Sequence, residues 1–221
     1  MCGRFALAGD LGVASSLPIL RETLRDVRPR YNIAPGTHVT VLAYNRLKAL
    51  AAVQMRWGLV PQWSRGPDHG LSLFNARVET IRQKPAFRES FERRRAVVPA
   101  SGYYEWQTRE SLKQPWLISA ADGGMMYFAA IWDQWRAADG SVLLSAAILT
   151  MEAHESVAMI HHRMPVMLTE AESLLWMQSD LTDEKVEQLT ALNRSRGLVA
   201  HAVHPRIGNS RMDGPECVEF V

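Results

Sequence analysis

The feature that most constrains the fold is a series of apolar segments with strand-forming composition, separated by short turns that contain glycine. The clearest of these segments are Trp116–Ser119, Met125–Trp132 and Val142–Thr150. Asp122-Gly123-Gly124 and Asp139-Gly140 lie between them, and Asp-Gly pairs favour tight hairpin turns. The sequence therefore predicts the central strands of an antiparallel sheet.

Other segments predict further strands, with helices between them. The expected strands are Val39–Ala43, Ala51–Trp57, Val97–Val98, Gly102–Trp106, Val166–Leu168, Leu198–Val203 and Cys217–Val221. The expected helices are Leu11–Val27, Pro85–Arg94, Glu152–Ile160, Thr169–Met177 and Thr182–Asn193. Residues 30–37 and 57–70 are expected to form loops. Because helices and strands do not alternate regularly, we expect an α+β fold: a single β-rich domain, residues 1–221, with a large antiparallel, barrel-like sheet and peripheral helices.

Composition limits the class of protein. The chain has 221 residues, of which 47% are apolar, and a formal charge of +2, which is too small to imply a nucleic-acid or membrane partner. Two cysteines are too few for a disulfide framework, and no signal peptide or apolar run of membrane-spanning length is present. We therefore expect a soluble cytoplasmic protein. Residues 75–95 concentrate seven basic and three acidic side chains, although such a segment is usually only a solvated face.

Cys2 follows the initiator methionine, so removal of Met1 would place an α-amine and a thiol on one residue. An α-amine has a pKa of about 7.7 to 8.0, compared with about 10.4 for lysine, so much more of it is in the nucleophilic free-base form at neutral pH. Such a residue can trap a carbonyl group, and its thiol can close a five-membered ring. The alternative is that Cys2 is a small apolar residue at the start of a strand.

Three more polar residues lie in apolar or aromatic surroundings. Glu105, between two aromatic residues, would act as a general acid/base if burial raised its pKa, or would pair with an arginine on a half-exposed strand. His161 could donate a proton to a leaving oxygen or form a structural hydrogen bond. Asn75 could orient a backbone amide or cap a turn.

Several other site types are not supported. The pairs His161-His162 and His201/His204 do not direct two rings at one point, and no Cys-x-x-Cys or His-Glu-x-x-His motif accompanies them, so no metal site is expected. Phosphate-binding glycine motifs and the Gly-x-Ser-x-Gly motif are also missing from the sequence. This argues against nucleotide-dependent enzymes and serine hydrolases.

Six segments in this order resemble the SRAP family, named for SOS-response-associated peptidase. They are Met1-Cys2-Gly3-Arg4-Phe5, Arg30-Tyr31-Asn32-Ile33-Ala34-Pro35, Trp57-Gly58-Leu59-Val60-Pro61, Asn75-Ala76-Arg77-Val78-Glu79-Thr80, Gly102-Tyr103-Tyr104-Glu105-Trp106 and His161-His162-Arg163-Met164-Pro165. The resemblance implies a β-rich fold with a positively charged cleft. It also implies a DNA-repair protein that captures abasic sites in single-stranded DNA, forming a thiazolidine through its N-terminal cysteine.

The resemblance also implies residue roles. Cys2 would be the crosslinking nucleophile, Asn75 its orienting partner and Glu105 the general acid/base. His161, and not His162, would assist opening of the deoxyribose. These roles fit the chemistry, because the open-chain aldehyde of an abasic site forms an imine with an amine, on which a thiol can close the ring. The same imine allows strand cleavage by β-elimination, a lyase side activity.

The DNA-contacting residues implied by the resemblance are Arg4, Asn32, Pro35, Trp63, Arg77, Thr80, Lys84 and Trp106. Basic residues would hold phosphates, and Trp63 and Pro35 would stack against bases or wedge between them. Some relatives resemble Trp-Trp where this chain has Trp63-Ser64, which leaves open what supplies a second stacking platform. The expected protein is a monomer in the cytoplasm, associated with the nucleoid when bound to DNA, without a cofactor, metal or membrane.

Two other functions remain open at this stage. One is a non-covalent single-stranded DNA binding module in which Cys2 is structural. The other is an N-terminal-nucleophile thiol peptidase or amidohydrolase, because glutamine amidotransferases also begin with Met-Cys-Gly and the family name includes a peptidase. A peptidase activity would include processing of the chain's own N-terminus.

Overall fold

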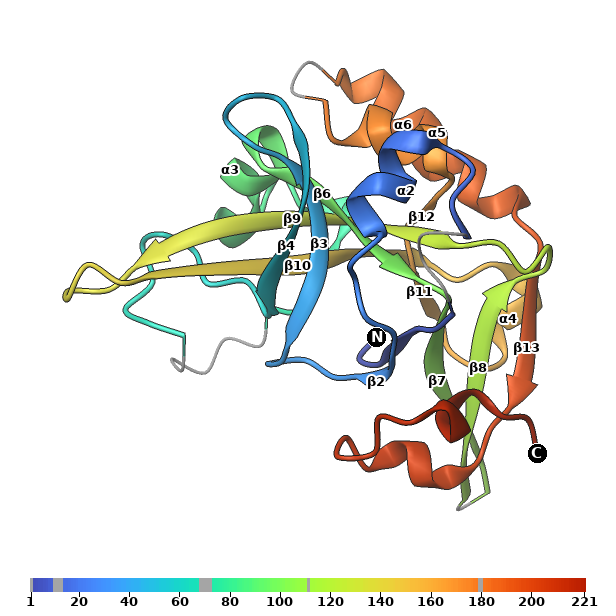
Figure 1. Cartoon of the computed structure of the whole chain (residues 1–221). Helices are drawn as coiled ribbons and strands as arrows, with labels where there is room; N and C mark the ends of the chain where they lie inside the picture. The colour runs from blue at the N-terminus through green and yellow to red at the C-terminus, as the bar shows by residue number, and fades with distance from the viewer. Residues whose placement is uncertain (1, 10–13, 68–72, 111, 179–180) are drawn as a thin grey trace.

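A closed barrel of five strands forms the centre of the molecule (Figure 1). The computed structural model describes residues 2–9, 14–67, 73–110, 112–178 and 181–221. The barrel strands are β3 (His38–Tyr44), β4 (Leu50–Trp57), β6 (Arg95–Ala100), β9 (Met126–Arg136) and β10 (Val142–Glu152). Antiparallel pairing runs in the order β4, β3, β6, β9 and β10. A parallel pairing of β10 with β4 then closes the ring.

A second sheet stands beside the barrel, on the right in Figure 1. Its order is β13 (Leu198–Ala202), β8 (Leu112–Ala120), β7 (Gly102–Arg109), β1 (Phe5–Leu7) and β2 (Arg30–Ile33). Gly102 opens β7 immediately after β6, and a Cβ atom there would lie only 2.7 Å from the Leu117 side chain. Glycine therefore allows the close strand packing at the junction of the two sheets.

Three short strands extend the barrel sheet. Strand β5 (Asn75–Arg77) runs parallel to β10, and β11 (Arg163–Pro165) pairs with the end of β10. Strand β12 (Met167–Leu168) pairs with β9. The end of β10 thus brings β5 and β11, which are far apart in the sequence, to one edge of the sheet.

The helices lie around both sheets (Figure 1). They are α2 (Pro18–Leu24), α3 (Pro85–Arg93), α4 (Glu155–Ala158), α5 (Glu170–Trp176) and α6 (Asp183–Ala191), with short 3-10 turns η1 (Val78–Thr80), η2 (Leu192–Ser195), η3 (Pro205–Gly208) and η4 (Pro215–Val218). Trp176 connects α5 to strand β6 of the barrel, because its indole N–H donates a hydrogen bond to the carbonyl oxygen of Ala96 at 3.0 Å. None of the helices in the described ranges is both long and apolar enough to cross a bilayer.

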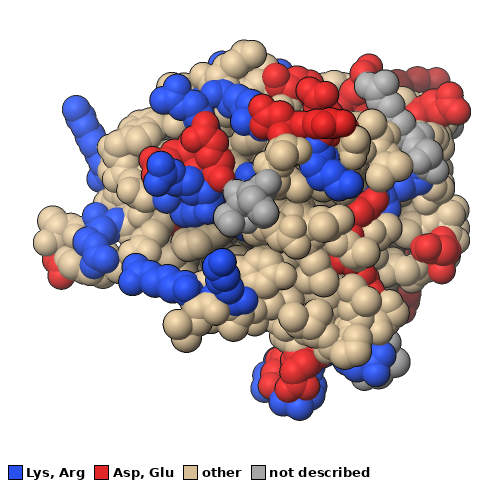
Figure 2. All heavy atoms as spheres, turned by 90° about the horizontal axis from the view of Figure 1, so that it is seen from above, with Lys and Arg blue, Asp and Glu red and all other residues tan. Residues whose placement is uncertain are grey.

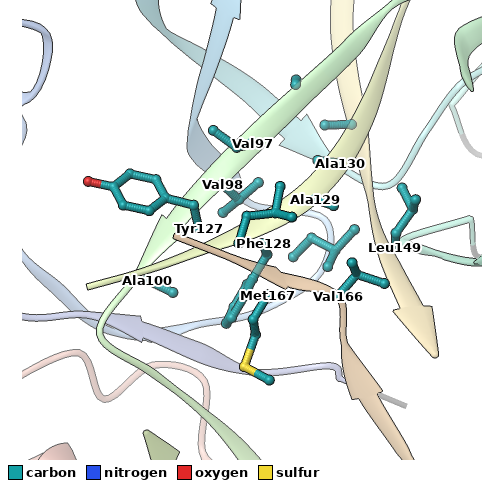
Figure 3. Close-up of a cluster of buried hydrophobic side chains, with 14 of the residues drawn as sticks. Val97, Val98, Ala100, Tyr127, Phe128, Ala129, Ala130, Leu149, Val166 and Met167 are labelled. Atoms are coloured by element: carbon teal, nitrogen blue, oxygen red, sulfur yellow. The ribbon is translucent and has the colours of Figure 1, made fainter. Parts of the chain in front are cut away.

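The core continues from the barrel into the second sheet. Figure 3 shows the cluster of Val97, Val98, Phe128, Ala129 and their buried neighbours between the strands. Phe128 is completely buried, and its ring meets Phe5 of β1 and Tyr103 of β7 edge to face, with centroids 6.0 and 6.2 Å apart. Burial of such a side chain stabilises the fold by about 1.5 to 3 kcal/mol. The same packing holds β1 and β7 against the barrel.

The α+β class with a barrel-like sheet and peripheral helices is confirmed. Helix α3 begins at Pro85, as the sequence predicts, since proline suits the first helical turn. The capping box of α5 is also present: the Thr169 hydroxyl accepts from the Glu172 N–H at 3.3 Å, and the Glu172 carboxylate accepts from the Thr169 N–H at 2.8 Å.

Four predicted elements were wrong in part. The helix expected over Leu11–Val27 is interrupted: Ala14 is helical, residues 15–17 are not, and α2 runs from Pro18 to Leu24. The residue before a proline avoids helical geometry, and Leu17 is extended. The strand expected at Cys217–Val221 is instead η4 followed by a single bridge from Phe220 to Val203. The helix expected over Glu152–Ile160 shrinks to α4, because β10 continues to Glu152.

The fourth difference is that Arg30–Ile33, expected to be a loop, is strand β2. The backbone N–H groups of Tyr31 and Asn32 donate to the Asp213 carboxylate at 2.6 and 2.8 Å, and β1 pairs with this strand. Parts of other predicted features, namely Met1, Leu11–Val13 and residues 68–70, lie outside the described residues.

Candidate active site

The start of the chain is anchored by Asn75. The side-chain amide of Asn75 donates a hydrogen bond to the carbonyl oxygen of Cys2 at 2.8 Å. Asn75 is the first residue of β5 and pairs with Ile148 of β10, so the anchor stands on the barrel sheet. The other amide atom, Oδ1, is buried and has no hydrogen-bond partner among the described residues. It is an acceptor that remains available beside Cys2.

Strand β7 provides the opposite wall. Phe5 pairs with Tyr103, and the Tyr104 N–H donates to the carbonyl oxygen of Arg4 at 2.9 Å, which keeps the first residues against this strand. Side chains alternate along β7, as predicted. Tyr103 packs in the main core, whereas Tyr104 and Trp106 belong to a separate cluster. Glu105 shares the face of Tyr103.

Glu105 is a buried carboxyl group, with 4% of its surface exposed. Burial raises the pKa of Glu105 above its ordinary value. Burial also strongly raises the pKa of the fully buried Cys2 thiol, and the negative charge of Glu105 adds to that shift. The thiol is therefore neutral at neutral pH, and a proton acceptor lies near it.

His161 completes the cluster. Its Nδ1 lies 3.8 Å from Oε1 of Glu105 and accepts a hydrogen bond from the Arg163 N–H at 2.9 Å. The same Nδ1 lies 3.2 Å from the carbonyl oxygen of Arg163, so both tautomers of the ring have a backbone partner at Nδ1. Burial lowers the pKa of His161, so the ring is mostly neutral near pH 7. The exposed ring of His162 stacks on it, with centroids 4.4 Å apart.

The structure thus brings Cys2, Asn75, Glu105 and His161 together. The simpler alternative does hold for His161, which forms a hydrogen bond with the backbone of Arg163. It does not hold for the other three: β1 begins only at Phe5, so Cys2 does not open a strand, and Asn75 lies in a strand rather than capping a turn. Glu105 is not a half-exposed strand residue. A histidine ring, a buried carboxyl and a thiol at the chain start can support acid/base and nucleophilic chemistry.

The structure shows contacts of Asn32 within the protein. Arg4 donates from Nη1 to the Asn32 Oδ1 at 2.7 Å and to the carbonyl oxygen of Ile207 at 3.0 Å. Asn32 is only 1% exposed, and its amide donates to the carbonyl oxygens of Ile207 and Asn209. In this structure the Asn32 side chain is buried and orients Arg4, and its expected contact with DNA stays a prediction.

The other expected DNA-contacting side chains reach the surface to different extents. Trp63 is 62% exposed in the loop after β4. Arg77 and Lys84 are exposed, and the partly exposed residues are Pro35, Thr80 and Trp106. They come from β5, β7, η1 and the intervening loops, so several chain segments contribute to the surface around the site.

Two residues near the site were missed in the sequence. Trp135 of β9 is partly exposed, and its indole N–H donates to the carbonyl oxygen of Ser64 at 2.8 Å, next to Trp63. Tyr103 is fully buried, and its hydroxyl has no hydrogen-bond partner among the described residues. Burial raises the pKa of Tyr103, and the charges of Cys2 and Glu105 raise it further. Only its alternation with Glu105 on β7 could have indicated this position.

The part of the chain that is described contains no cluster of three His, Cys, Asp or Glu side chains suited to holding a metal ion.

Comparisons with known proteins all indicate one family. The model of the family "SOS response associated peptidase (SRAP)" matches residues 1–210. The abasic site processing protein YedK of Escherichia coli is 31% identical over 232 residues, covering all of both chains. YoqW of Bacillus subtilis, also named an abasic site processing protein, is 29% identical over 99% of both chains.

Solved structures show the same fold. A crystal structure of a protein from Bacteroides thetaiotaomicron superposes over the full length of both chains with a TM-score of 0.80 at 22% identity. A phage-related protein from Bordetella bronchiseptica superposes over 92% of this chain and 94% of its own with a TM-score of 0.68 at 27% identity. Since the family model spans nearly the whole sequence, the chain belongs to the SRAP family.

Proposed function

We propose that this protein is a DNA-repair enzyme that captures abasic sites in single-stranded DNA by forming a covalent thiazolidine with Cys2. The observation that carries the proposal is the anchoring of Cys2 by Asn75 next to the buried Glu105 carboxyl and the His161 ring. The names of the relatives, abasic site processing proteins, support the same substrate.

The active form begins at Cys2. While Met1 is attached, the nitrogen of Cys2 is an amide and cannot attack a carbonyl group. Removal of Met1, by an aminopeptidase or by the protein's own peptidase activity, yields an α-amine with an ordinary pKa of about 7.7 to 8.0. A substantial fraction of this amine is unprotonated at neutral pH.

The sugar must open before capture. An abasic deoxyribose is mostly a cyclic hemiacetal, and opening moves the proton of its C1 hydroxyl away while the ring oxygen gains one. The protonated form of His161 donates a ring proton to the sugar ring oxygen and becomes neutral, and the ionised Glu105 carboxylate, 3.8 Å from Nδ1 of His161, accepts the hydroxyl proton and becomes neutral. The product is the open-chain aldehyde.

Capture then takes two steps. The amine of Cys2 adds to the aldehyde carbon, and loss of water leaves an imine. The Cys2 sulfur adds to the imine carbon, while the thiol proton is transferred to the nitrogen through Glu105, which closes the thiazolidine. Because the buried thiol is neutral, a nearby proton acceptor is needed for ring closure. The imine also permits β-elimination, so strand cleavage competes when ring closure is slow.

The surrounding surface holds the strand without reading its sequence. Arg4, Arg77 and Lys84 bind phosphates, and Thr80 and Trp106 line the path of the strand. Pro35 and Trp63 contact bases, and Trp135, beside the Ser64 backbone, supplies the second stacking platform. The protein acts as a monomer of one domain in the cytoplasm, without metal or cofactor, and associates with the nucleoid when bound to damaged DNA.

The test is to incubate the protein with matched abasic and intact oligonucleotides and to separate the products under denaturing conditions. We expect an adduct with the abasic strand only, lost in Cys2→Ala, and an intact protein mass that lacks Met1. An equal adduct with intact DNA, or activity with Met1 retained, would refute the mechanism. Binding without any adduct would favour the non-covalent module, and glutamine or peptide hydrolysis would favour the N-terminal-nucleophile alternative.

Cys2→Ser separates the two nucleophiles. The variant keeps the α-amine but has no thiol. We expect imine formation, trapped by borohydride, and strand cleavage, with no adduct stable to denaturation in the absence of reductant. A stable adduct from Cys2→Ser would rule out the thiazolidine.

A further inference from the structure

We propose that a second, basic groove binds the phosphodiester backbone of single-stranded DNA that extends from the abasic site. This inference rests on the proposed function and enlarges its binding surface. Two adjoining cavities of about 650 and 490 Å³ form the basic groove, and both are lined by Arg46, Arg94 and Trp132. Lys48 and Arg93 line the first cavity, and Arg136 lines the second.

The basic groove carries positive charge that is not neutralised locally. Arg46, Lys48, Arg93 and Arg136 are exposed, and none of them forms an ion pair with an acidic side chain in the described parts of the chain. Figure 2 shows Lys and Arg side chains gathered on the left half of the face seen from above. This charge attracts a polyanion and releases counterions on binding.

Two arginines at the groove bond to other groups of the protein and are not among the proposed phosphate contacts. Arg94 pairs with Glu89 and with the buried Asp133, at 3.2 and 3.3 Å, so its charge is compensated. Arg95 is buried and donates to backbone carbonyl oxygens, including those of Trp176 and Phe91 at 2.9 Å. The proposed phosphate contacts therefore come from the four exposed residues.

The hairpin that presents Arg46 and Lys48 is held in shape by Asn45. The side-chain oxygen of Asn45 accepts from the N–H groups of Leu47 and Ala49 at 2.9 and 3.0 Å, and the backbone of Asn45 forms hydrogen bonds with Lys48 and Ala49. Positively charged groups on a braced turn lose less conformational freedom on binding than groups on a loose loop.

The composition of the basic groove fits single-stranded nucleic acid better than a compact anion. Trp132 is half-buried between the two cavities, and the partly exposed Tyr44 lines the larger one. Aromatic rings between cations are typical of surfaces on which bases stack while the backbone is neutralised.

The basic groove adjoins the loop that carries Trp63. Gln62 lines the smaller cavity, and its neighbour in the chain is Trp63. The Gln62 N–H donates to Asp133 Oδ2 at 3.3 Å, and the Trp135 indole N–H donates to the carbonyl oxygen of Ser64, so this loop lies on β9 beside the groove. A strand that stacks on Trp63 can continue into the groove without leaving the protein surface.

The experiment compares the binding of intact oligonucleotides of about 6 and about 20 nucleotides, which bracket the roughly 4 to 16 nucleotides that a single-strand binding surface usually covers. The variant is Arg46→Ala/Lys48→Ala/Arg136→Ala. With the long strand we expect weaker binding. We also expect the slope of the logarithm of the binding constant against the logarithm of salt concentration to be shallower by about 2, because three phosphate contacts are lost and each contributes about 0.7. With the short strand we expect wild-type binding.

The matched control is Arg25→Ala/Lys113→Ala/Lys185→Ala, which removes three exposed charges that line neither cavity. An unchanged slope with the long strand, an equal loss with the short strand, or an equal loss in the control would each overturn the proposal. Adducts are scored separately on a short abasic strand, where the groove variant should react like the wild type. If the wild type forms no adduct, the proposed function fails, while the binding series still tests the groove.

Discussion

The side-chain amide of Asn75 donates a 2.8 Å hydrogen bond to the carbonyl oxygen of Cys2. This bond links the barrel sheet to the residue that we propose as nucleophile. It spans 73 positions of the sequence, so only the closed fold can position the N-terminus in this way.

The first prediction concerns this bond. Asn75→Ala should slow adduct formation by up to about tenfold, because a hydrogen bond contributes roughly 0.5 to 1.5 kcal/mol and its loss frees the chain start. Asn75→Asp keeps the shape but, when ionised, has no N–H to donate, so it should not restore the rate. The rate is measured as denaturation-resistant adduct against time on an abasic oligonucleotide. Wild-type rates in both variants would show that the bond does not position Cys2.

The second prediction concerns the stability cost of Glu105. Burial raises the pKa of its carboxyl in the folded state above the unfolded value of about 4.3. Between the unfolded-state pKa and the folded-state pKa of Glu105, the folded protein binds more protons than the unfolded chain, so folding stability falls as pH rises. The destabilisation by the ionised carboxylate is complete above the folded-state pKa. Glu105→Gln should therefore be more stable than the wild type at pH 7 to 8, and the difference should vanish below about pH 4.

Thermal unfolding of both proteins across this pH range measures the effect. The same Glu105→Gln variant should lose roughly 10²- to 10⁴-fold in adduct formation, the usual contribution of a general acid/base. Higher stability together with lower activity would mark Glu105 as a residue kept for function. A variant that is less stable than the wild type at pH 7 would contradict the prediction.

The third prediction uses two adjacent histidines. His161 lies 3.8 Å from Glu105 and has a lowered pKa because of burial, whereas His162 is exposed and stacked on its outer side. His161→Ala should slow capture of the natural, ring-closed abasic site by about 10²-fold or more, because a positioned acid is lost. His162→Ala should stay within about twofold of the wild type. Equal effects of the two substitutions would argue for a general role of the histidine pair.

The barrel was predictable because its signals are local. Alternating apolar segments and the Asp139-Gly140 turn specify the β9–β10 hairpin without knowledge of any partner. Strand β2 was missed because what stabilises it is remote: Asp213, 181 positions away from Asn32, accepts its N–H. A single sequence does not indicate which distant carboxylate will accept hydrogen bonds from the backbone N–H groups at the edge of a strand.

In the candidate site, too, some features could be predicted from the sequence and others depend on contacts between distant segments. Its four central residues were chosen through a family resemblance, but their separations, such as 3.8 Å between Glu105 and His161, follow from how β7 and the chain before β11 meet. Asn32 was expected to contact DNA through the same resemblance, and the fold buries its side chain, which accepts a hydrogen bond from Arg4. Trp135 was overlooked because the predicted strand ended at Trp132, whereas β9 continues to Arg136.

The fourth prediction tests Trp135 as the second stacking platform. Its indole N–H holds the Ser64 carbonyl oxygen at 2.8 Å, and its partly exposed ring lies next to the Trp63 loop. A stacked base contributes about 1 to 3 kcal/mol, so Trp135→Ala should weaken binding of intact single strands by roughly 5- to 150-fold. Trp135→Phe keeps an aromatic face and loses only the hydrogen bond, so it should retain most of the affinity. Fluorescence anisotropy with a labelled oligonucleotide measures both variants, and an equal loss in the two would assign Trp135 to bracing the loop through Ser64 rather than to stacking.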